Sequence, residues 1–380
     1  MIIELHALQT FAPSNLNRDD TGNPKDALFG GVRRARISSQ SAKRAMRVSD
    51  VFKQGLAPMD IGLRTRYVAT EITKRLKDLG YDQAIAQEQT NLLIAKLFAK
   101  ADGKNADRAS VLIYLSSSEF DWLTQKVIDL ISAGHSLKDS GKEEDKKWAT
   151  IKKEFVKTIK ERSSAPDIAL FGRMLAESPE LNIDAACQVE HALSTHEVAT
   201  AEFDYFTAVD DLSSDEQSGA GMLGLVAYNS ATYYRCVRIH WDQLVKNLNG
   251  DVATATLTVD SFMKAFALVV PTGMQNRFLN QHMPDFLLAV ARPYNDGQSL
   301  MNAFEKPINA PRQGGYAQPS INALVKYWDE TERAFRLYAP QAISVLDPHG
   351  YLNTSEELQQ ATVNNLMDWV YTITSVLPTE

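Results

Sequence analysis

The sequence has little of what metal sites, disulfide scaffolds and common catalytic centres require. Its two cysteines, Cys187 and Cys236, form no CxxC pair and have no neighbouring histidine pair, so neither a disulfide framework nor a zinc site is indicated. We interpret both as small buried hydrophobic residues. The histidines lack an HExxH spacing, and neither a nucleophile elbow nor a Walker loop is present. We therefore expect no metal, no cofactor and no enzymatic activity.

The sequence also lacks a long hydrophobic run. Its first residues contain no cationic segment followed by an apolar stretch, and no later window reaches the apolar length that spans a bilayer. We expect a cytoplasmic protein without a membrane partner. The 380 residues, of which 44% are hydrophobic, allow a substantial core and two or three domains.

Acidic residues are absent from one strongly basic segment, although the whole chain carries a formal net charge of −7. Six basic side chains lie between positions 33 and 47, namely Arg33, Arg34, Arg36, Lys43, Arg44 and Arg47. A concentrated positive charge on an acidic protein attracts phosphate groups locally. A polyanion is therefore the first partner that the sequence indicates.

The basic segment predicts a short strand followed by a helix. Residues 32–37 resemble a strand in which Arg34 and Arg36 point the same way. Residues 38–47 begin with a serine suited to an N-cap and continue with helix formers. Ala42, Ala45 and Met46 would lie on the buried face of this helix. The opposite face would carry Gln40, Lys43, Arg44 and Arg47. A basic face is often only solvated surface, but the lack of interspersed acidic residues favours phosphate binding.

Hydrophobic periodicity divides the chain into a mixed part and a helical insertion. Strands are predicted at residues 2–8, 231–239 and 284–291. Helical periodicity predominates between about residues 63 and 183. Further helices are predicted at residues 185–193, 261–270, 320–338 and 354–375. The pattern indicates an α+β fold interrupted by a helical domain.

Two polar loops carry weaker signals. The segment Gly219–Gly224 forms a GxGxxG pattern, but an acidic loop precedes it where a dinucleotide site needs a buried strand. A nucleotide-cofactor enzyme is therefore a remote alternative. The loop at residues 271–277 could offer backbone amides and the Arg277 guanidinium to a ligand.

Few residues could support acid–base chemistry. His6 is one candidate, and the pair Asp19 and Asp20 could bind a metal ion or abstract a proton from a ribose hydroxyl. The alternative for His6 is packing within a strand. The alternative for the aspartates is turn chemistry or pairing with Arg18. An endoribonuclease using Asp19 or Asp20 is the main alternative function.

Several segments point to one family. They read NRDD at 17–20, KDALFGGVRRARISSQSAKRAMR at 25–47, IALFGRM at 168–174, DYFTAVDDL at 204–212 and NAFEK at 302–306. These segments closely resemble the CasC family, the CRISPR RNA backbone subunit of type I-E Cascade complexes within the RAMP superfamily. The resemblance extends over most of the chain and is weakest in the helical insertion.

The resemblance implies a hand-like α+β fold. Its parts would be an RRM-like (ferredoxin-like) palm, a large helical fingers insertion and a thumb β-hairpin. The palm would comprise residues 1–56, 181–200 and 229–380, the fingers residues 57–180 and the thumb residues 201–228. The thumb would then contain the GxGxxG pattern.

The resemblance also implies roles for individual residues. Contacts with the RNA backbone are implied for Arg18, Lys25, Gln40, Lys43, Arg44 and Arg47, with Ser38 and Ser39 nearby. The loop arginine Arg277 is added to this set. A wedge against a kinked guide nucleotide is implied for Met174, Phe206, Thr207 and Leu223. Phe206 could equally be a core aromatic residue.

By the same resemblance, the chain would be a non-catalytic subunit that binds CRISPR RNA (crRNA). Copies would stack head to tail along the spacer as a helical filament and present the guide for pairing with a target DNA strand. Phosphate contacts carry no sequence information, so a spacer of any sequence could be held. Other partners would be the large, small, 5′-handle-binding and 3′-hairpin-binding subunits of Cascade.

Overall fold

The computed structural model describes residues 1–57, 59, 61–98, 101–103, 105–132, 142–161, 165–175, 178–198, 202–207, 223–293, 297–336 and 338–379. The chain divides into two compact units. The sheet unit consists of Met1–Gly55, Gln188–His240 and Val259–Pro378. The helical unit is formed mainly by Leu56–Cys187 and Trp241–Thr258.

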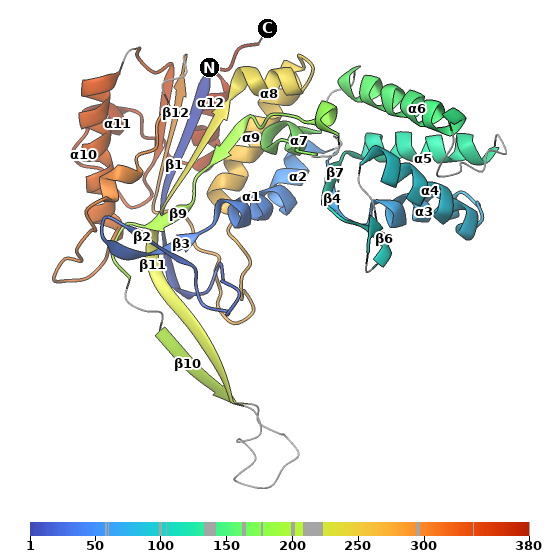
Figure 1. Cartoon of the computed structure of the whole chain (residues 1–380). Helices are drawn as coiled ribbons and strands as arrows, with labels where there is room; N and C mark the ends of the chain where they lie inside the picture. The colour runs from blue at the N-terminus through green and yellow to red at the C-terminus, as the bar shows by residue number, and fades with distance from the viewer. Residues whose placement is uncertain are drawn as a thin grey trace. The chain divides into compact units, whose positions relative to one another are not determined.

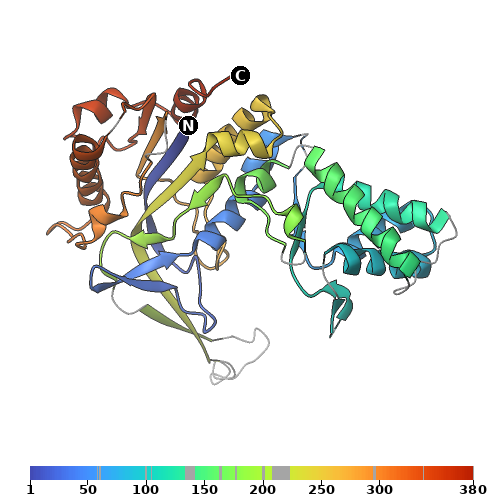
Figure 2. The ribbon, with the colours of Figure 1, turned by 45° about the horizontal axis from the view of Figure 1, so that its top comes forward.

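A large antiparallel sheet forms the centre of the sheet unit (Figure 1). Its strands follow the order β13-β12-β1-β11-β9-β3-β2, and β10 and β8 pair with β11. The strand bounds are Ile2–Ser14 for β1, Asp26–Phe29 for β2, Val32–Ile37 for β3, Cys187–Val189 for β8, Ala192–Ser194 for β9, Glu202–Thr207 for β10, Leu223–His240 for β11, Phe286–Arg292 for β12 and Ala342–Leu346 for β13. The β10–β11 hairpin projects from the sheet in both views (Figure 1, Figure 2).

Strand β1 lies between β12 and β11 and is buried along most of its length. It pairs antiparallel with β11 and β12, so that Ile2 lies opposite His240 on one side and Arg292 on the other. The guanidinium of Arg292 donates to the buried carboxylate of Glu4 on β1, with 2.9 Å between Nε and Oε2, and to Glu332. Pairing of these charges permits their burial in the sheet.

Apolar side chains cover both faces of the sheet. On one face, Tyr234 packs in a cluster with Trp328 of helix α10 (Ala317–Phe335). On the other face, Phe11 of β1, Met46 of α1 (Ser39–Val48) and Phe266 of α9 (Val252–Leu268) line one small apolar cavity. Helix α1 is therefore held against the sheet by one of its sides. The short helix α2 (Asp50–Leu56) follows it.

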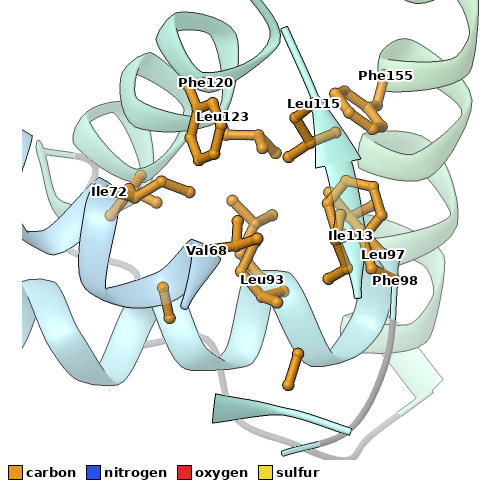
Figure 3. Close-up of a cluster of buried hydrophobic side chains, with 14 of the residues drawn as sticks. Val68, Ile72, Leu93, Leu97, Phe98, Ile113, Leu115, Phe120, Leu123 and Phe155 are labelled. Atoms are coloured by element: carbon orange, nitrogen blue, oxygen red, sulfur yellow. The ribbon is translucent and has the colours of Figure 1, made fainter. Parts of the chain in front are cut away.

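The helical unit has a hydrophobic core of its own (Figure 3). Its elements are β4 (Leu63–Thr65), α3 (Val68–Asp78), α4 (Gln83–Leu97), β5 (Ala101–Asp102), β6 (Asn105–Ala109), β7 (Ile113–Leu115), α5 (Ser117–Ser132), α6 (Lys142–Glu161), α7 (Pro166–Phe171), the 3-10 helix Pro179–Leu181 and α8 (Trp241–Asn247). Val68, Ile72, Leu93, Phe120 and Phe155 are buried together in this core. The helical character predicted between about residues 63 and 183 is confirmed.

The predicted mixed α+β class is confirmed by the antiparallel sheet and its flanking helices. The strands predicted at residues 2–8, 231–239 and 284–291 lie within β1, β11 and β12. The assignment of these parts to palm, fingers and thumb domains stays a prediction. None of the helices that the structure describes combines the length and apolar character needed to cross a bilayer.

Two helix predictions are wrong. Residues 185–193 contain the strands β8 and β9, because β9 pairs with both β3 and β11 in the sheet. Residues 354–375 form two helices, α11 (Glu356–Gln360) and α12 (Leu366–Thr374), and not one. The chain leaves helical geometry between them because the Val363 amide donates to the Val345 carbonyl of β13.

Candidate nucleic-acid interface

Helix α1 begins where the sequence predicts, at a serine cap. Ser38 has extended backbone angles, and its Oγ accepts from the Ser41 amide at 3.3 Å. The Ser38 amide itself donates to Oδ1 of Asn17 at 2.9 Å. These bonds fix the start of the helix relative to the loop after β1, as is typical of a capped N-terminus.

The two predicted faces of α1 are largely confirmed. Met46 is buried and Ala42 lines the apolar cavity beneath the helix, whereas Gln40 and Arg44 are exposed. Lys43 and Arg47 are half-buried on the polar side, and so is Ser39 at the start of the helix. Ala45 is an exception, because it lines a groove together with Arg44 and not the buried face.

The strand before α1 contributes fewer surface cations than its sequence suggests. Arg34 is fully buried, and its guanidinium donates to the carbonyls of Ser194, Phe304 and Glu305. Burial lowers the pKa of Arg34 from its ordinary value. Arg36 is half-buried and donates through Nε to the Asp26 carbonyl at 3.0 Å. Arg34, which the sequence analysis counts among the basic side chains that attract phosphate, is therefore buried and not available to a phosphate.

The loop after β1 is built around Asp19. One carboxylate oxygen, Oδ1, accepts from the Thr21 amide at 2.9 Å, the Thr21 hydroxyl at 2.8 Å and the Asn23 amide at 2.9 Å. The Thr21 hydroxyl bond is the main cause that lowers the pKa of Asp19. Turn chemistry, one of the two alternatives for this residue, is thus observed. Asp20 and Arg18 are exposed beside it.

Asn15 connects this loop to the hairpin. Its side-chain amide donates to the Gly22 carbonyl in the loop at 3.1 Å and to the Ala227 carbonyl of β11 at 2.8 Å. Asn15 itself is buried. The loop and the base of the β10–β11 hairpin therefore share one hydrogen-bonding side chain.

A groove of about 920 Å³ lies between the loop, helix α1 and the segment after α9. Arg18, Asp19 and Asp20 line it from the loop, and Arg44 lines it from the helix. Residues far apart in the sequence, Arg18 and Arg44, are thus brought to one groove. Asp50 of α2 also lines it, so two cations and three carboxylates give this groove a mixed electrostatic character.

A second groove, of about 540 Å³, is richer in cations. Lys25, Arg33 and Arg36 line it together with Phe203 of β10. Arg33 forms an ion pair with Asp26, which also lines this groove. Lys25 is half-buried. This groove borders the hairpin that the family resemblance implies to be a thumb.

His191 interacts electrostatically with several of these cations. Its Nδ1 accepts from the Ser39 amide, the first of helix α1, at 2.9 Å. Burial lowers the pKa of His191, and the nearby positive charges of Arg36, Lys25 and Lys43 lower it further. Sequence reasoning missed His191, because it belongs to no motif and lies far from α1 in the chain.

The residues predicted to wedge a nucleotide lie in both units. Met174 belongs to the helical unit and is 83% exposed, a strong exposure for an apolar side chain. Phe206, which is 40% exposed, and exposed Thr207 lie on β10. Phe206 is therefore not a core residue. Leu223 begins β11 opposite Thr207, but its side chain and the remote cofactor segment 219–222 lie outside the described residues.

Arg277 lies exposed in the loop that follows α9, as a ligand-binding side chain would. Its guanidinium carbon is 4.3 Å from the centre of the Phe206 ring. Arg277, from the predicted backbone-binding set, thus contacts Phe206, from the predicted wedge.

The other residues considered for catalysis or metal binding are buried in the fold. His6 is fully buried, and its Nδ1 lies 2.8 Å from the Tyr234 hydroxyl, so it packs within its strand. Both cysteines are buried, as predicted. Among the described residues, no group of three or more His, Cys, Asp or Glu side chains is arranged to hold a metal ion.

One known protein family matches nearly the whole chain. A family described as CT1975-like protein matches residues 3–369. The chain belongs to the CT1975-like family. The matched residues include the sheet, the loop after β1 and helix α1. With the structural similarities below, it confirms the resemblance drawn from the sequence.

Two solved structures resemble this member of the CT1975-like family over nearly its full length. A chain of a "CRISPR RNA-guided surveillance complex, pre-nicking" is 28% identical with a TM-score of 0.83, and the match covers 99% of each chain. A chain of a "CRISPR RNA-guided surveillance complex" is 24% identical with a TM-score of 0.76, covering 99% of this chain and 100% of the other. The second similarity concerns the fold alone. A comparison with curated proteins finds no match.

Proposed function

We propose that the chain is a non-catalytic crRNA-binding backbone subunit of a Cascade surveillance complex. The observation that carries this proposal is the cationic groove that Lys25, Arg33 and Arg36 line beside strand β10. Lys25, Arg36 and Lys43 also interact electrostatically with His191, which accepts from the first amide of α1. Cationic side chains on rigid elements suit a sugar–phosphate backbone, because guanidinium and ammonium groups bind phosphate oxygens strongly. Similarity over 99% of the chain to a subunit of an RNA-guided complex supports this assignment.

The finer proposal is a type I-E subunit with an RRM-like palm, helical fingers and a thumb. Copies would associate head to tail along the spacer, since a heterologous interface that does not close generates an open helix. Arg18, Gln40, Arg44 and Arg47 would add backbone contacts to the central cations. Ser38 and Ser39 would lie near the phosphates at the helix start. The complex would act in the cytoplasm with the other Cascade subunits.

The proposed mechanism separates holding the guide from reading the target. Backbone contacts hold the crRNA without regard to its sequence. Exposed Met174 and the hairpin residues Phe206, Thr207 and Leu223 would press against the guide at intervals and kink it. The segments between kinks would be ordered before a target DNA strand pairs with them, which lowers the entropic cost of hybridisation.

A double substitution on the polar face of α1 tests the function. Lys43→Ala with Arg44→Ala removes two cations without touching the buried face of the helix. We expect crRNA affinity to fall to a similar extent for unrelated spacers. The slope of log affinity against log salt should decrease by about one unit for each phosphate contact removed. Filter binding at several salt concentrations measures both quantities.

The matched control is Lys74→Ala with Lys77→Ala on α3. Both lysines are exposed, and the change in net charge is the same. Affinity and salt slope should stay close to those of the wild-type chain. A loss confined to one spacer sequence, or an equal loss in the control, would contradict the proposed contacts.

The non-catalytic assignment is tested separately. Asp19 is engaged by three donors in its turn, which supports a role in loop structure and not in proton abstraction. Labelled guide RNA incubated with the chain and divalent metal should stay intact. Metal-dependent cleavage that Asp20→Ala abolishes would establish the endoribonuclease instead.

A further inference from the structure

The Phe206 ring occupies a space that a glycine on the partner strand provides. Strand β10 pairs with β11 so that Phe206 lies opposite Gly224. A Cβ atom added at Gly224 would lie 2.2 Å from Cζ of Phe206, far inside van der Waals contact. The ring therefore rests over bare backbone, and any larger residue at position 224 would displace it. This explains the one glycine of the GxGxxG pattern that the structure describes.

The ring is contacted on another side by Arg277. Its guanidinium carbon lies 4.3 Å from the ring centroid, within the range of a cation–π contact. A planar guanidinium can stack on an aromatic face while its N–H groups stay hydrated, so the contact is compatible with the exposure of both side chains.

The loop that carries Arg277 is fixed at several points. Asn280 donates to the Gly273 carbonyl at 2.6 Å, and Gln281 donates to the Leu268 carbonyl at 2.7 Å. The Phe278 ring lies 5.8 Å from that of Tyr228 on β11. Arg277 thus extends toward the hairpin from a loop that is itself attached to the base of the same hairpin.

We propose that Arg277 is a positioning residue that holds the Phe206 ring against Gly224 before RNA binds. This inference rests on the proposed function, in which Phe206 contacts a kinked nucleotide. All described side chains of β10 are exposed, so the strand alone gives Phe206 no pocket. A ring that is ordered in advance has less conformational freedom to lose when a nucleotide packs against it.

The proposal differs measurably from a direct phosphate contact by Arg277. A phosphate contact contributes to the salt dependence of RNA binding, and its removal lowers the slope by about one unit. A positioning residue acts through Phe206, so its removal leaves the slope unchanged and alters the geometry of the nucleotide at the hairpin. Gly224→Ala should have the same effect as loss of Arg277, although it changes no charge.

The experiment uses guide RNAs with 2-aminopurine at successive spacer positions, because the fluorescence of this base rises when it is unstacked. With the wild-type chain, a subset of positions should brighten. Arg277→Gln and Gly224→Ala should each reduce that rise about two- to five-fold, which corresponds to loss of an exposed cation–π contact. Arg277→Lys should lie between them and the wild type. Arg312→Gln serves as the control for charge, because Arg312 is another exposed arginine of the sheet unit.

A second measurement needs no RNA. Fluorine NMR of the chain with 4-fluorophenylalanine at position 206 should show one sharp resonance, which broadens or shifts in Arg277→Gln but not in Arg312→Gln. Thermal melting confirms that each variant is folded.

The outcomes separate the two proposals. A lower salt slope with unchanged 2-aminopurine signals in Arg277→Gln would make Arg277 a phosphate ligand and overturn the positioning role. An unchanged fluorine resonance in Arg277→Gln would also overturn it. Failure of the wild-type chain to bind guide RNA would instead refute the proposed function, while the fluorine measurement would still report on the contact itself.

Discussion

Among single residues, burial separates the arginines of the basic segment into two kinds. Arg34 is enclosed by three backbone carbonyls of the sheet unit, and its charge serves the fold. Arg36, two positions further along the same strand, lines the cationic groove beside Lys25. Charge counting in the sequence treats the two as equal. Only the packing of β3 against its neighbours makes them different.

The two arginines should therefore respond differently to the same substitution. Arg34→Met leaves buried carbonyls without donors and should lower the free energy of unfolding by roughly 3 kcal/mol. Arg36→Met should change it by less than about 1 kcal/mol but weaken crRNA binding and reduce its salt slope. Urea unfolding and filter binding measure these effects. A stable Arg34→Met variant that has lost RNA affinity would show that the assignment is reversed.

At the level of elements, the start of α1 depends on side chains from three separate segments. Ser38 caps the helix with its side-chain oxygen. Oδ1 of Asn17 accepts a hydrogen bond from the Ser38 amide, and Nδ1 of His191 accepts one from the Ser39 amide. The amides at a helix start have no partner within the helix, so each of these acceptors stabilises it. The surface that we propose for phosphate binding is held in place by this set.

Substitutions at His191 should separate its acceptor role from its titration. In His191→Asn, the amide oxygen can replace Nδ1 as acceptor, so the variant should stay within about 0.5 kcal/mol of the wild type near neutral pH. His191→Phe should lose roughly 1 kcal/mol, because the Ser39 amide then has only water. Urea unfolding at neutral pH provides the comparison.

The pH dependence of stability follows from the lowered pKa of His191. Its pKa in the folded chain lies below the ordinary value of 6.5. The unfolded chain therefore binds more protons as pH falls through 6.5, and the free energy of unfolding decreases. His191→Asn lacks this contribution, so its stability should fall less over the same interval. Identical pH profiles for the two chains would refute this account.

Helices and strands differ in how well local sequence patterns predict them. The start of α1 was predictable because a serine cap and helical spacing act locally. The strands at residues 187–189 and 192–194 were not, because they form by pairing with β11, and β9 also with β3, which no local pattern reveals. For the same reason, the set Arg18, Lys25 and Lys43 could be proposed from resemblance, whereas His191 and the contact between Arg277 and Phe206 required coordinates.

At the scale of the whole molecule, charge is distributed unevenly. The chain carries a net charge of −7, yet basic groups converge on one part of the sheet unit. Copies of such a protein repel one another through their average charge, and RNA would have to compensate for this repulsion locally. Assembly should therefore depend on the guide.

We expect the number of bound copies to increase in steps with the length of the guide RNA. In the proposed head-to-tail arrangement, each added copy would need a fixed number of nucleotides, because a repeated heterologous contact sets a constant spacing. Mass photometry of the chain with RNAs of graded length measures the steps. The chain carrying Lys43→Ala with Arg44→Ala should need more RNA to reach the same occupancy. Equal assembly without RNA would contradict guide dependence.

The amide of Asn15 has a consequence for how binding events influence one another. Because it holds Gly22 and Ala227 at once, a displacement of the loop cannot leave the foot of the hairpin unaffected. We therefore expect occupancy at the loop and occupancy at the hairpin to share a coupling free energy, in which case each alters the affinity of the other by the same factor. A strand of nucleic acid lying across both regions would engage them cooperatively.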